Sequence, residues 1–324
     1  MKKDSKIYVA GHRGLAGSAI MRELLRQGYT NLIGRTHAEL DLEDAAATLQ
    51  FFEQQRPEVV FLAAAKVGGI HANNTYPVEF LMSNLLVESN VCRAAYAIGV
   101  QRLLFLGSSC IYPRDCPQPI KEEYLLTGGL EATNRPYALA KIAGIEMCWS
   151  YNRQYGTKWL AAMPTNLYGP GDNYDLSSSH VLPALIRKMH ETKIADAKEV
   201  VLWGSGTPKR EFLYVDDLAN ALVFLAALDN ECYSQLTHPE QSPVINIGTG
   251  IDLSIRELAE TIADVVGYKG QFIQDTSKPD GTMRKVLDVS KMSALGWQAS
   301  TCLKDGISQT YHAFKGNYSV SSSL

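Results

Sequence analysis

The amino-acid sequence predicts an α/β fold with a doubly wound parallel sheet, and three observations support this. The 324-residue chain is 46% apolar, so it can bury a large core. A short apolar run at 6–10 meets three glycines, Gly11, Gly14 and Gly17, and then a helical pattern at 18–27. A second apolar run begins at Leu103 and ends in small polar residues, which is typical of a buried parallel strand.

Composition excludes several classes of function. The formal net charge is −3, which gives no electrostatic case for a nucleic-acid partner or an anionic membrane. Apolar runs stay well short of the roughly 18 residues that a membrane-spanning helix needs. The six cysteines are scattered, without the paired spacing of a metal site, so we expect no metal, reduced thiols and a cytoplasmic protein.

The remaining pattern alternates strands with helices along the whole chain. In the first half we expect strands near 31–34, 57–65 and 103–107, a long helix at 78–98 and another that begins at Pro136. In the second half we expect strands at 159–165, 200–203 and 244–248, and helices at 180–190, 216–228 and 255–266, the last capped by Ser254. Two further helical patterns follow residue 285.

The glycine turn lies in the context that a dinucleotide site requires, namely between the first strand and the first helix. Gly11 allows a tight turn, Gly14 lets the backbone approach a pyrophosphate, and Gly17 allows close helix packing. Arg35 follows the second strand, where a site that prefers NAD has an acid. With Arg13 it suits a 2′-phosphate, which favours NADP, although two solvated arginines would explain the same residues.

A hydroxyl and a thiol, Ser108 and Cys110, come together at the end of the strand that begins at Leu103. Tyr137 and Lys141 follow about 29 residues later and are four apart, so they share one helical face. A nearby ammonium lowers the pKa of a phenol, which would make Tyr137 a proton donor or acceptor. The pair alone is a weak signal, and its value comes from this order of elements.

Longer strings resemble the extended short-chain dehydrogenases/reductases, a family that modifies nucleotide sugars. The resemblance covers nearly the whole chain and implies a Rossmann-type doubly wound sheet with a smaller C-terminal α/β substrate domain. The strings that carry it most clearly are Gly-His-Arg-Gly-Leu-Ala-Gly (11–17), Leu-Gly-Ser-Ser-Cys-Ile-Tyr-Pro (106–113), Met-Pro-Thr-Asn-Leu-Tyr-Gly-Pro (163–170), Trp-Gly-Ser-Gly-Thr-Pro-Lys-Arg-Glu-Phe-Leu (203–213) and Lys-Pro-Asp-Gly-Thr-Met-Arg-Lys (278–285).

The resemblance also implies a function. We expect a bifunctional NADPH-dependent 3,5-epimerase and 4-reductase that converts GDP-4-keto-6-deoxy-D-mannose to GDP-L-fucose. Ser108 and Tyr137 would stabilise the charge on O4, with Lys141 beside them. Cys110 would be the base and His180 the acid of the epimerisation.

The same resemblance assigns binding residues for NADP(H) and for a GDP-sugar substrate. The residues expected at the cofactor are Gly11, His12, Arg13, Gly14, Leu15, Ala16, Gly17, Arg35, His37, Asp41, Leu42, Ala63, Ala64, Ala65, Leu106, Gly107, Lys141, Pro164, Thr165, Asn166, Leu167 and His180. The residues expected at the substrate are Lys188, Trp203, Arg210, Asp280 and Lys285. Two of these depart from the family: His37 replaces a second basic residue, and Lys188 replaces an arginine.

Several questions stay open at this level. Other nucleotide-sugar 4-reductases or epimerases share the fold, and a non-catalytic NADP-binding sensor is a further alternative. The chain has no carboxylate between Leu106 and Arg114, which counts against a 4,6-dehydratase. Asn84 is either a polar core residue or a catalytic neighbour. We expect a cofactor domain at 1–170 with 211–250 returning to it, a substrate domain at 171–210 and 251–324, and a homodimer formed through the two long helices.

Overall fold

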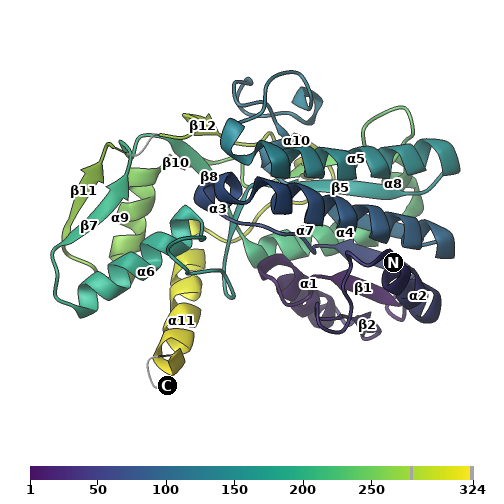
Figure 1. Ribbon diagram of the computed structural model, residues 1–324, viewed down its shortest axis with the longest axis horizontal. Helices are drawn as coiled ribbons and strands as arrows, with labels where there is room; N and C mark the ends of the chain where they lie inside the picture. Colours follow the sequence, from purple (N-terminus) through teal and green to yellow (C-terminus); the bar gives the residue numbers. More distant parts are fainter. Residues whose placement is uncertain (278–279, 322–324) are drawn as a thin grey trace.

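The largest element is a six-stranded parallel sheet in the computed structural model, which describes residues 1–277 and 280–321 (Figure 1). Across the sheet the order is β2-β1-β3-β4-β5-β9. Five of the strands are buried along their whole length, as their apolar runs predict. The strands are β1 (Ile7–Ala10), β2 (Leu32–Ile33), β3 (Val59–Leu62), β4 (Arg102–Leu106), β5 (Trp159–Pro164) and β9 (Val244–Ile247).

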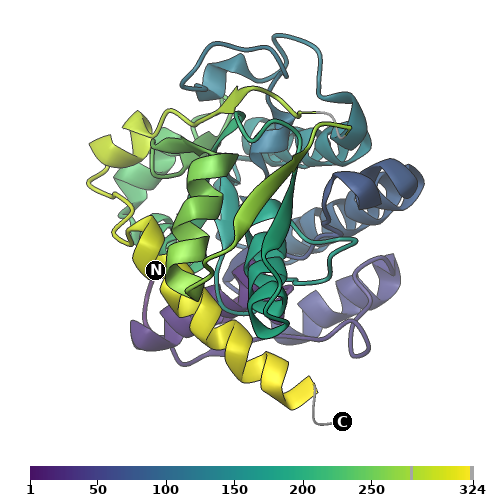
Figure 2. The same ribbon diagram turned by 90° about the vertical axis from the view of Figure 1, so that its left-hand side faces the viewer.

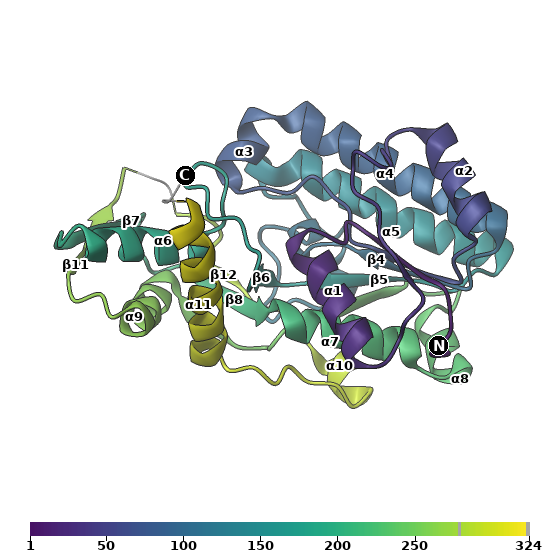
Figure 3. The same cartoon turned by 90° about the horizontal axis from the view of Figure 1, so that it is seen from below.

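Helices cover both faces of this sheet, so the doubly wound, Rossmann-type prediction is confirmed (Figure 3). One face carries α2 (Ala45–Gln55), α4 (Pro77–Ile98) and α5 (Arg135–Tyr155). The other carries α1 (Leu15–Arg26) and α7 (Val215–Ala227). Shorter helices are α3 (Ile70–Thr75), α8 (Asn230–Leu236) and α10 (Ser290–Ala294). Ligands of such sheets bind beyond the carboxyl ends of the strands, where the strand order reverses. Here that point lies between β1 and β3.

A smaller lobe follows the large sheet and has its own apolar core (Figure 2). Its four-stranded sheet contains β6 (Asn166–Tyr168), β8 (Lys209–Tyr214), β10 (Asp252–Ser254) and β12 (Arg284–Lys285). A separate parallel pair joins β7 (Glu199–Trp203) to β11 (Gln271–Asp275). The helices of this lobe are α6 (Val181–Ile194), α9 (Ile255–Val266) and α11 (Leu303–Ser321).

The chain passes between the two lobes more often than the expected boundaries describe. In the segment 211–250, α7 and β9 join the large sheet, whereas β8 at its start belongs to the small lobe. Met292 and Trp297 also pack into the core beneath the large sheet. The division into domains therefore stays a proposal. Met292 and Trp297 show that the chain returns to the large-sheet lobe once more after residue 250.

Within the described residues no helix is both long and apolar enough to cross a membrane. The same residues contain no group of three or more His, Cys, Asp or Glu side chains that is placed to hold a metal ion.

Candidate active site

Two glycines shape the turn between β1 and α1. Gly11 has a φ of +79°, and a Cβ at this position would lie 2.8 Å from the Ala64 Cα, so the turn and the end of β3 approach each other closely. A Cβ on Gly17 would lie 2.1 Å from the Gly11 carbonyl oxygen. Gly14 precedes α1 without a side-chain cap, and a helix N-terminus of this kind binds phosphate. The close approach of a pyrophosphate to Gly14 stays a prediction.

Arg13 and Arg35 lie near the same carboxylate. Hydrogen bonds from Thr36, and to a smaller degree the charges of Arg35 and Arg13, lower the pKa of Glu39. The Arg35 guanidinium lies 5.7 Å from the centre of the Phe51 ring, which holds it at the edge of the sheet. The charges of Arg13 and Arg35 thus act on one place after β2, and the binding of a 2′-phosphate there stays a prediction.

The other residues predicted around the adenosine end differ in their burial and in their contacts. The His12 ring packs on Gly34, where a Cβ would lie 2.4 Å from the ring, and its buried Nδ1 has no partner among the described residues. His37 is exposed, with its Nδ1 3.6 Å from the Asp41 carboxylate. Leu42 is buried in the core, and its predicted contact with an adenine ring stays a prediction.

The loop after β3 is held by Asn84. The Asn84 side chain accepts a hydrogen bond from the Lys66 N–H at 2.9 Å and donates to the carbonyl oxygens of Lys66 and Phe80. The Asn84 amide is thus bonded to the backbone of this loop, and its role as a catalytic neighbour stays an open alternative. The small side chains of residues 63–65 precede the loop and lie beside the turn after β1.

The end of β4 places a hydroxyl and a thiol together, as predicted. A Cβ on Gly107 would lie 2.2 Å from the Met163 Cε, so a larger residue here would require the end of the Met163 side chain to move. Ser108 then begins a short 3-10 turn, and its Oγ accepts a hydrogen bond from the Cys110 N–H at 3.2 Å. The strand therefore delivers both side chains to one point at the edge of the sheet.

Lys141 is buried beneath Tyr137 on α5. Its ammonium donates to the Leu106 carbonyl oxygen at 2.9 Å and lies 5.9 Å from the centre of the Tyr137 ring. The Glu88 carboxylate lies 3.1 Å from the same Nζ. Glu88 was not predicted; its only sequence signal is a charged residue on the buried side of a long helix.

The prediction that Lys141 lowers the pKa of Tyr137 is wrong for this chain without ligands. Burial raises the pKa of Tyr137, and the charges of Cys110 and Glu88 raise it further, whereas a hydrogen bond with Ser108 acts in the opposite direction. The phenol therefore stays protonated at neutral pH. A protonated phenol is the form that donates a proton to a ketone oxygen.

Cys110 has polar neighbours from distant parts of the chain. The Asn134 Nδ2 lies 3.3 Å from the Cys110 Sγ, and the Lys285 Nζ lies 3.9 Å from it. The charge of Cys110 also acts on Arg210, which places that guanidinium nearby. Asn134 was not among the predicted site residues; its position just before the helix of Tyr137 is the signal that sequence reasoning passed over.

His180 directly precedes α6 and does not cap it. The loop before it is tied to the start of α3 by a hydrogen bond from the Gly69 N–H to the Ser178 carbonyl oxygen at 2.9 Å. The side chain keeps part of its surface open to solvent, yet the protein atoms around it lower the pKa of the imidazole by partial burial. His180 is therefore neutral at neutral pH in the free chain.

The predicted substrate residues lie in the small lobe, on α6, on β7, β8 and β12, and in the loop before β12. The Lys188 ammonium lies 5.2 Å from the centre of the Trp203 ring, and Trp203 is 59% exposed. Asp280 accepts a hydrogen bond from the Ser205 N–H at 2.9 Å, next to Trp203. Of the resemblance string at 278–285, residues 278 and 279 lie outside the described residues.

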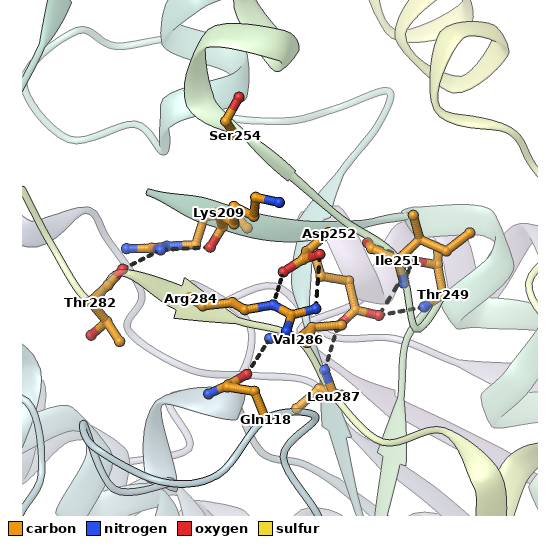
Figure 4. A network of polar contacts seen from close by, with 12 residues as sticks. Gln118, Lys209, Thr249, Ile251, Asp252, Ser254, Thr282, Arg284, Val286 and Leu287 are labelled. Atoms are coloured by element: carbon orange, nitrogen blue, oxygen red, sulfur yellow. Dashed lines mark hydrogen bonds and ion pairs between the residues drawn. The ribbon is translucent and has the colours of Figure 1, made fainter. Parts of the chain in front are cut away.

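Arg210 and Lys285 are paired in register on the adjacent strands β8 and β12. The Arg210 guanidinium donates to the Thr282 carbonyl oxygen, which fixes it over the loop that precedes β12 (Figure 4). These two cations and Cys110 therefore meet where the small lobe faces the end of β4.

Glu211 fastens the small lobe to the large sheet and was not predicted. Its fully buried carboxylate accepts hydrogen bonds from the Thr249, Gly250 and Leu287 N–H groups at 2.6, 2.7 and 2.8 Å, of which those from Thr249 and Leu287 can be followed in Figure 4. Burial raises the pKa of Glu211, and these hydrogen bonds oppose the rise. The only sequence signal for Glu211 was a single acidic residue next to Arg210.

The turn after β5 meets the same strand. The Thr165 hydroxyl and the Asn166 amide donate to the Glu211 carbonyl oxygen at 3.2 and 2.8 Å. The predicted cofactor residues Pro164, Thr165, Asn166 and Leu167 thus lie where β5 passes into β6. Their contact with a nicotinamide stays a prediction.

Comparisons with known proteins agree with this geometry. The model of the NAD dependent epimerase/dehydratase family matches residues 7–248. A putative GDP-L-fucose synthase 2 from Arabidopsis thaliana is 55% identical over 98% of this chain and 94% of its own length. A GDP-L-fucose synthase from Escherichia coli K12 is 54% identical over 96% and 97%.

A solved structure shows the same fold. A GDP-D-glycero-L-gluco-heptose synthase from Campylobacter jejuni, determined in the presence of NADPH, aligns with a TM-score of 0.89 at 36% identity, covering 97% of this chain and 99% of its own. Membership of one family explains the strand order, the glycine turn and the group formed by Ser108, Tyr137 and Lys141. The chain belongs to the NAD dependent epimerase/dehydratase family.

Proposed function

We propose that this protein is a bifunctional NADPH-dependent 3,5-epimerase and 4-reductase that converts GDP-4-keto-6-deoxy-D-mannose to GDP-L-fucose. One observation carries the proposal: the thiol of Cys110, which can act as a base toward a carbon acid, lies two residues from Ser108, and its charge acts on Tyr137. Reduction alone does not need this thiol. The relatives that are more than half identical along the chain bear the name of this activity.

The cofactor is NADP(H). The tight approach at Gly11, the unpartnered Nδ1 of His12 and the free N–H groups at the start of α1 fit a dinucleotide phosphate. Arg13 and Arg35 fit the extra 2′-phosphate. When bound, this cofactor supplies the hydride for C4.

The epimerisation uses the acidity that the C4 ketone gives to the protons on C3 and C5. Cys110 removes each proton, and the charge that develops on O4 is stabilised by the hydroxyl groups of Ser108 and Tyr137. His180 returns a proton from the opposite face. Its lowered pKa makes the protonated imidazole a stronger donor but a rarer form at neutral pH.

The reduction uses the same oxygen-facing groups. Tyr137 donates its phenolic proton to O4 as hydride reaches C4, and its raised pKa keeps that proton in place beforehand. Lys141 donates a hydrogen bond to the Leu106 carbonyl oxygen, which holds its ammonium at the end of β4 beside Tyr137. Both phases build negative charge on one oxygen, so a single pair of donors serves both.

Binding of the GDP end is assigned to the small lobe. Lys188, Arg210 and Lys285 provide positive charge for the pyrophosphate, and Trp203 offers an exposed aromatic face. Asp280, beside them, is an acceptor for polar groups of the base or sugar.

A substrate panel tests the proposal. We expect rapid NADPH oxidation with GDP-4-keto-6-deoxymannose and none with UDP- or dTDP-linked ketosugars. A reaction with the other nucleotides would support a different nucleotide-sugar reductase of the same family. Binding of NADPH without oxidation in any mixture would support the sensor instead.

We further propose a cytoplasmic homodimer. On α4 the exposed side chains Val78, Met82 and Leu86 are four residues apart and form one apolar stripe, and Leu139 on the neighbouring α5 is also exposed. The six unpaired cysteines are consistent with a reducing compartment. Light scattering of Met82→Glu should give the mass of a monomer; an unchanged mass would contradict this interface.

A further inference from the structure

A buried carboxylate lies directly behind the reacting groups. The Glu88 side chain is fully buried on α4, and its Oε1 lies 3.1 Å from the Lys141 Nζ. Apart from Lys141, the described part of the chain offers no donor to its two oxygens. Space for it exists because residue 144 is glycine: a Cβ there would lie 2.8 Å from the Glu88 Oε2.

This arrangement affects the pKa of Tyr137, in addition to burial and the charge of Cys110. An unpaired Lys141 ammonium beneath the ring would favour the phenolate. The Glu88 charge opposes that effect, and it is one of the causes that raise the pKa of Tyr137. The pair also holds Nζ in place, because Nζ donates to the Leu106 carbonyl oxygen at 2.9 Å and forms an ion pair with the Glu88 carboxylate at 3.1 Å.

We propose that Glu88 is a positioning residue that holds the Lys141 ammonium at the end of β4 and compensates its charge, so that Tyr137 enters the reaction as a protonated phenol. The inference deepens the proposed function and rests on it, because a protonated phenol is what the reduction of a ketone needs.

The charged and titratable groups around this pair are few. Lys141, Tyr137 and Cys148 face it from α5, and Cys92 lies on its own helix. A hydrogen bond with Cys92, burial and the Glu88 charge raise the pKa of Cys148, so this thiol stays neutral. Cys110 faces Tyr137 from the turn after β4 and is present equally in every variant below.

The test compares wild type with Glu88→Gln, which keeps the shape and removes the charge. The first readout needs no substrate. Ultraviolet titration of tyrosinate, with the matching Tyr137→Phe protein subtracted, isolates Tyr137 from the 16 tyrosines. We expect its ionisation in Glu88→Gln to begin at least about one pH unit lower than in wild type. The alkaline limb of kcat for ketosugar reduction should move in the same direction.

Glu122→Gln is the matched control, because Glu122 is another buried glutamate paired with a lysine, Lys291 at 3.5 Å, away from Tyr137. After subtraction of the matching Tyr137→Phe protein, which removes the effect of Glu122 on Tyr112, the Tyr137 titration in Glu122→Gln should coincide with that of wild type. If circular dichroism shows that Glu88→Gln does not fold, Glu88→Asp replaces it and should show a smaller shift of the same sign.

The inference is overturned if folded Glu88→Gln or Glu88→Asp titrates like wild type, or if Glu122→Gln shifts Tyr137 equally. These outcomes are separate from the fate of the proposed function, since wild type that fails to reduce GDP-4-keto-6-deoxymannose refutes that function while the titration still reports on Glu88.

Discussion

On the large-sheet side of the site, Glu88 and Lys141 are buried and paired at 3.1 Å, whereas on the small-lobe side Trp203 is 59% exposed beside a half-buried lysine. The first side is built from long helices and continuous strands. The second includes β6, β10 and β12, which have only two or three residues each, and it is fastened by Glu211. Tyr137 and Lys141 thus sit on a long helix packed against the large sheet, whereas Trp203 and Asp280, which are proposed to hold the nucleotide, sit at the end of a strand and in a loop.

The largest expected effect is on the buried side. Tyr137→Phe removes the proton donor for O4 and should lower kcat by about 10²-fold or more. NADPH affinity, measured by fluorescence titration, should stay close to wild type. A kcat within a few-fold of wild type would mean that another group donates the proton.

Cys110→Ser should separate the two phases. Deuterium incorporation from D2O at C3 and C5 should slow by about 10²-fold, because a hydroxyl is a far weaker base than a thiolate. Hydride transfer to a substrate that is already epimerised should change much less. Unchanged incorporation would remove Cys110 from the mechanism.

Arg35→Ala tests the proposed 2′-phosphate site at the edge of the large sheet. Losing one cation from the proposed 2′-phosphate site should raise KM for NADPH by about 10-fold, with a smaller change for NADH. Arg26→Ala, which removes an exposed arginine from the end of α1, serves as the control. Equal effects of Arg35→Ala on both cofactors would contradict the 2′-phosphate site.

Glu211→Gln tests the fastening of the small lobe. One of the backbone N–H groups would lose a charged acceptor, and we expect unfolding to become easier by about 2 kcal/mol. KM for the GDP-sugar should rise more than kcat falls. Glu260→Gln, an exposed carboxylate of α9, should leave both the melting temperature and KM unchanged.

The smallest effect concerns Asp172, in the loop that precedes His180. Burial raises the pKa of Asp172 to about 7, with a hydrogen bond from the Asn173 N–H opposing the rise. Between its unfolded pKa of about 4 and pH 7, the folded chain holds a proton that the unfolded chain releases, so stability falls as pH rises. Asp172→Asn should therefore raise the melting temperature by a few degrees at about pH 8 and much less at about pH 5. An equal change at both pH values would contradict the raised pKa.

The same contrast explains what the sequence could predict. Buried strands such as β4 leave continuous apolar runs, and the turn at Gly11 follows from local chemistry, so the large sheet and the order of Ser108, Tyr137 and Lys141 were predicted. Strands β10 and β12 have only three and two residues, and they exist because β8 lies between them. Local periodicity carries no signal for such strands.

The prediction for Tyr137 failed for a related reason. The spacing of Tyr137 and Lys141 shows that they share a helical face, but it does not show which group lies behind Lys141. That group is Glu88, some fifty residues earlier in the chain on another helix; burial and the charge of Cys110 raise the pKa of the phenol, and the charge of Glu88 adds to this rise. Asn134 and Glu211 were missed in the same way, because their partners come from distant segments.

The most direct test is to identify the product that the wild-type protein forms from GDP-4-keto-6-deoxymannose and NADPH in D2O, by nuclear magnetic resonance. The account predicts GDP-L-fucose with deuterium at both C3 and C5, because one site performs both epimerisations and the reduction. A C4-reduced sugar that keeps the D-manno configuration and carries no deuterium at those carbons would contradict it.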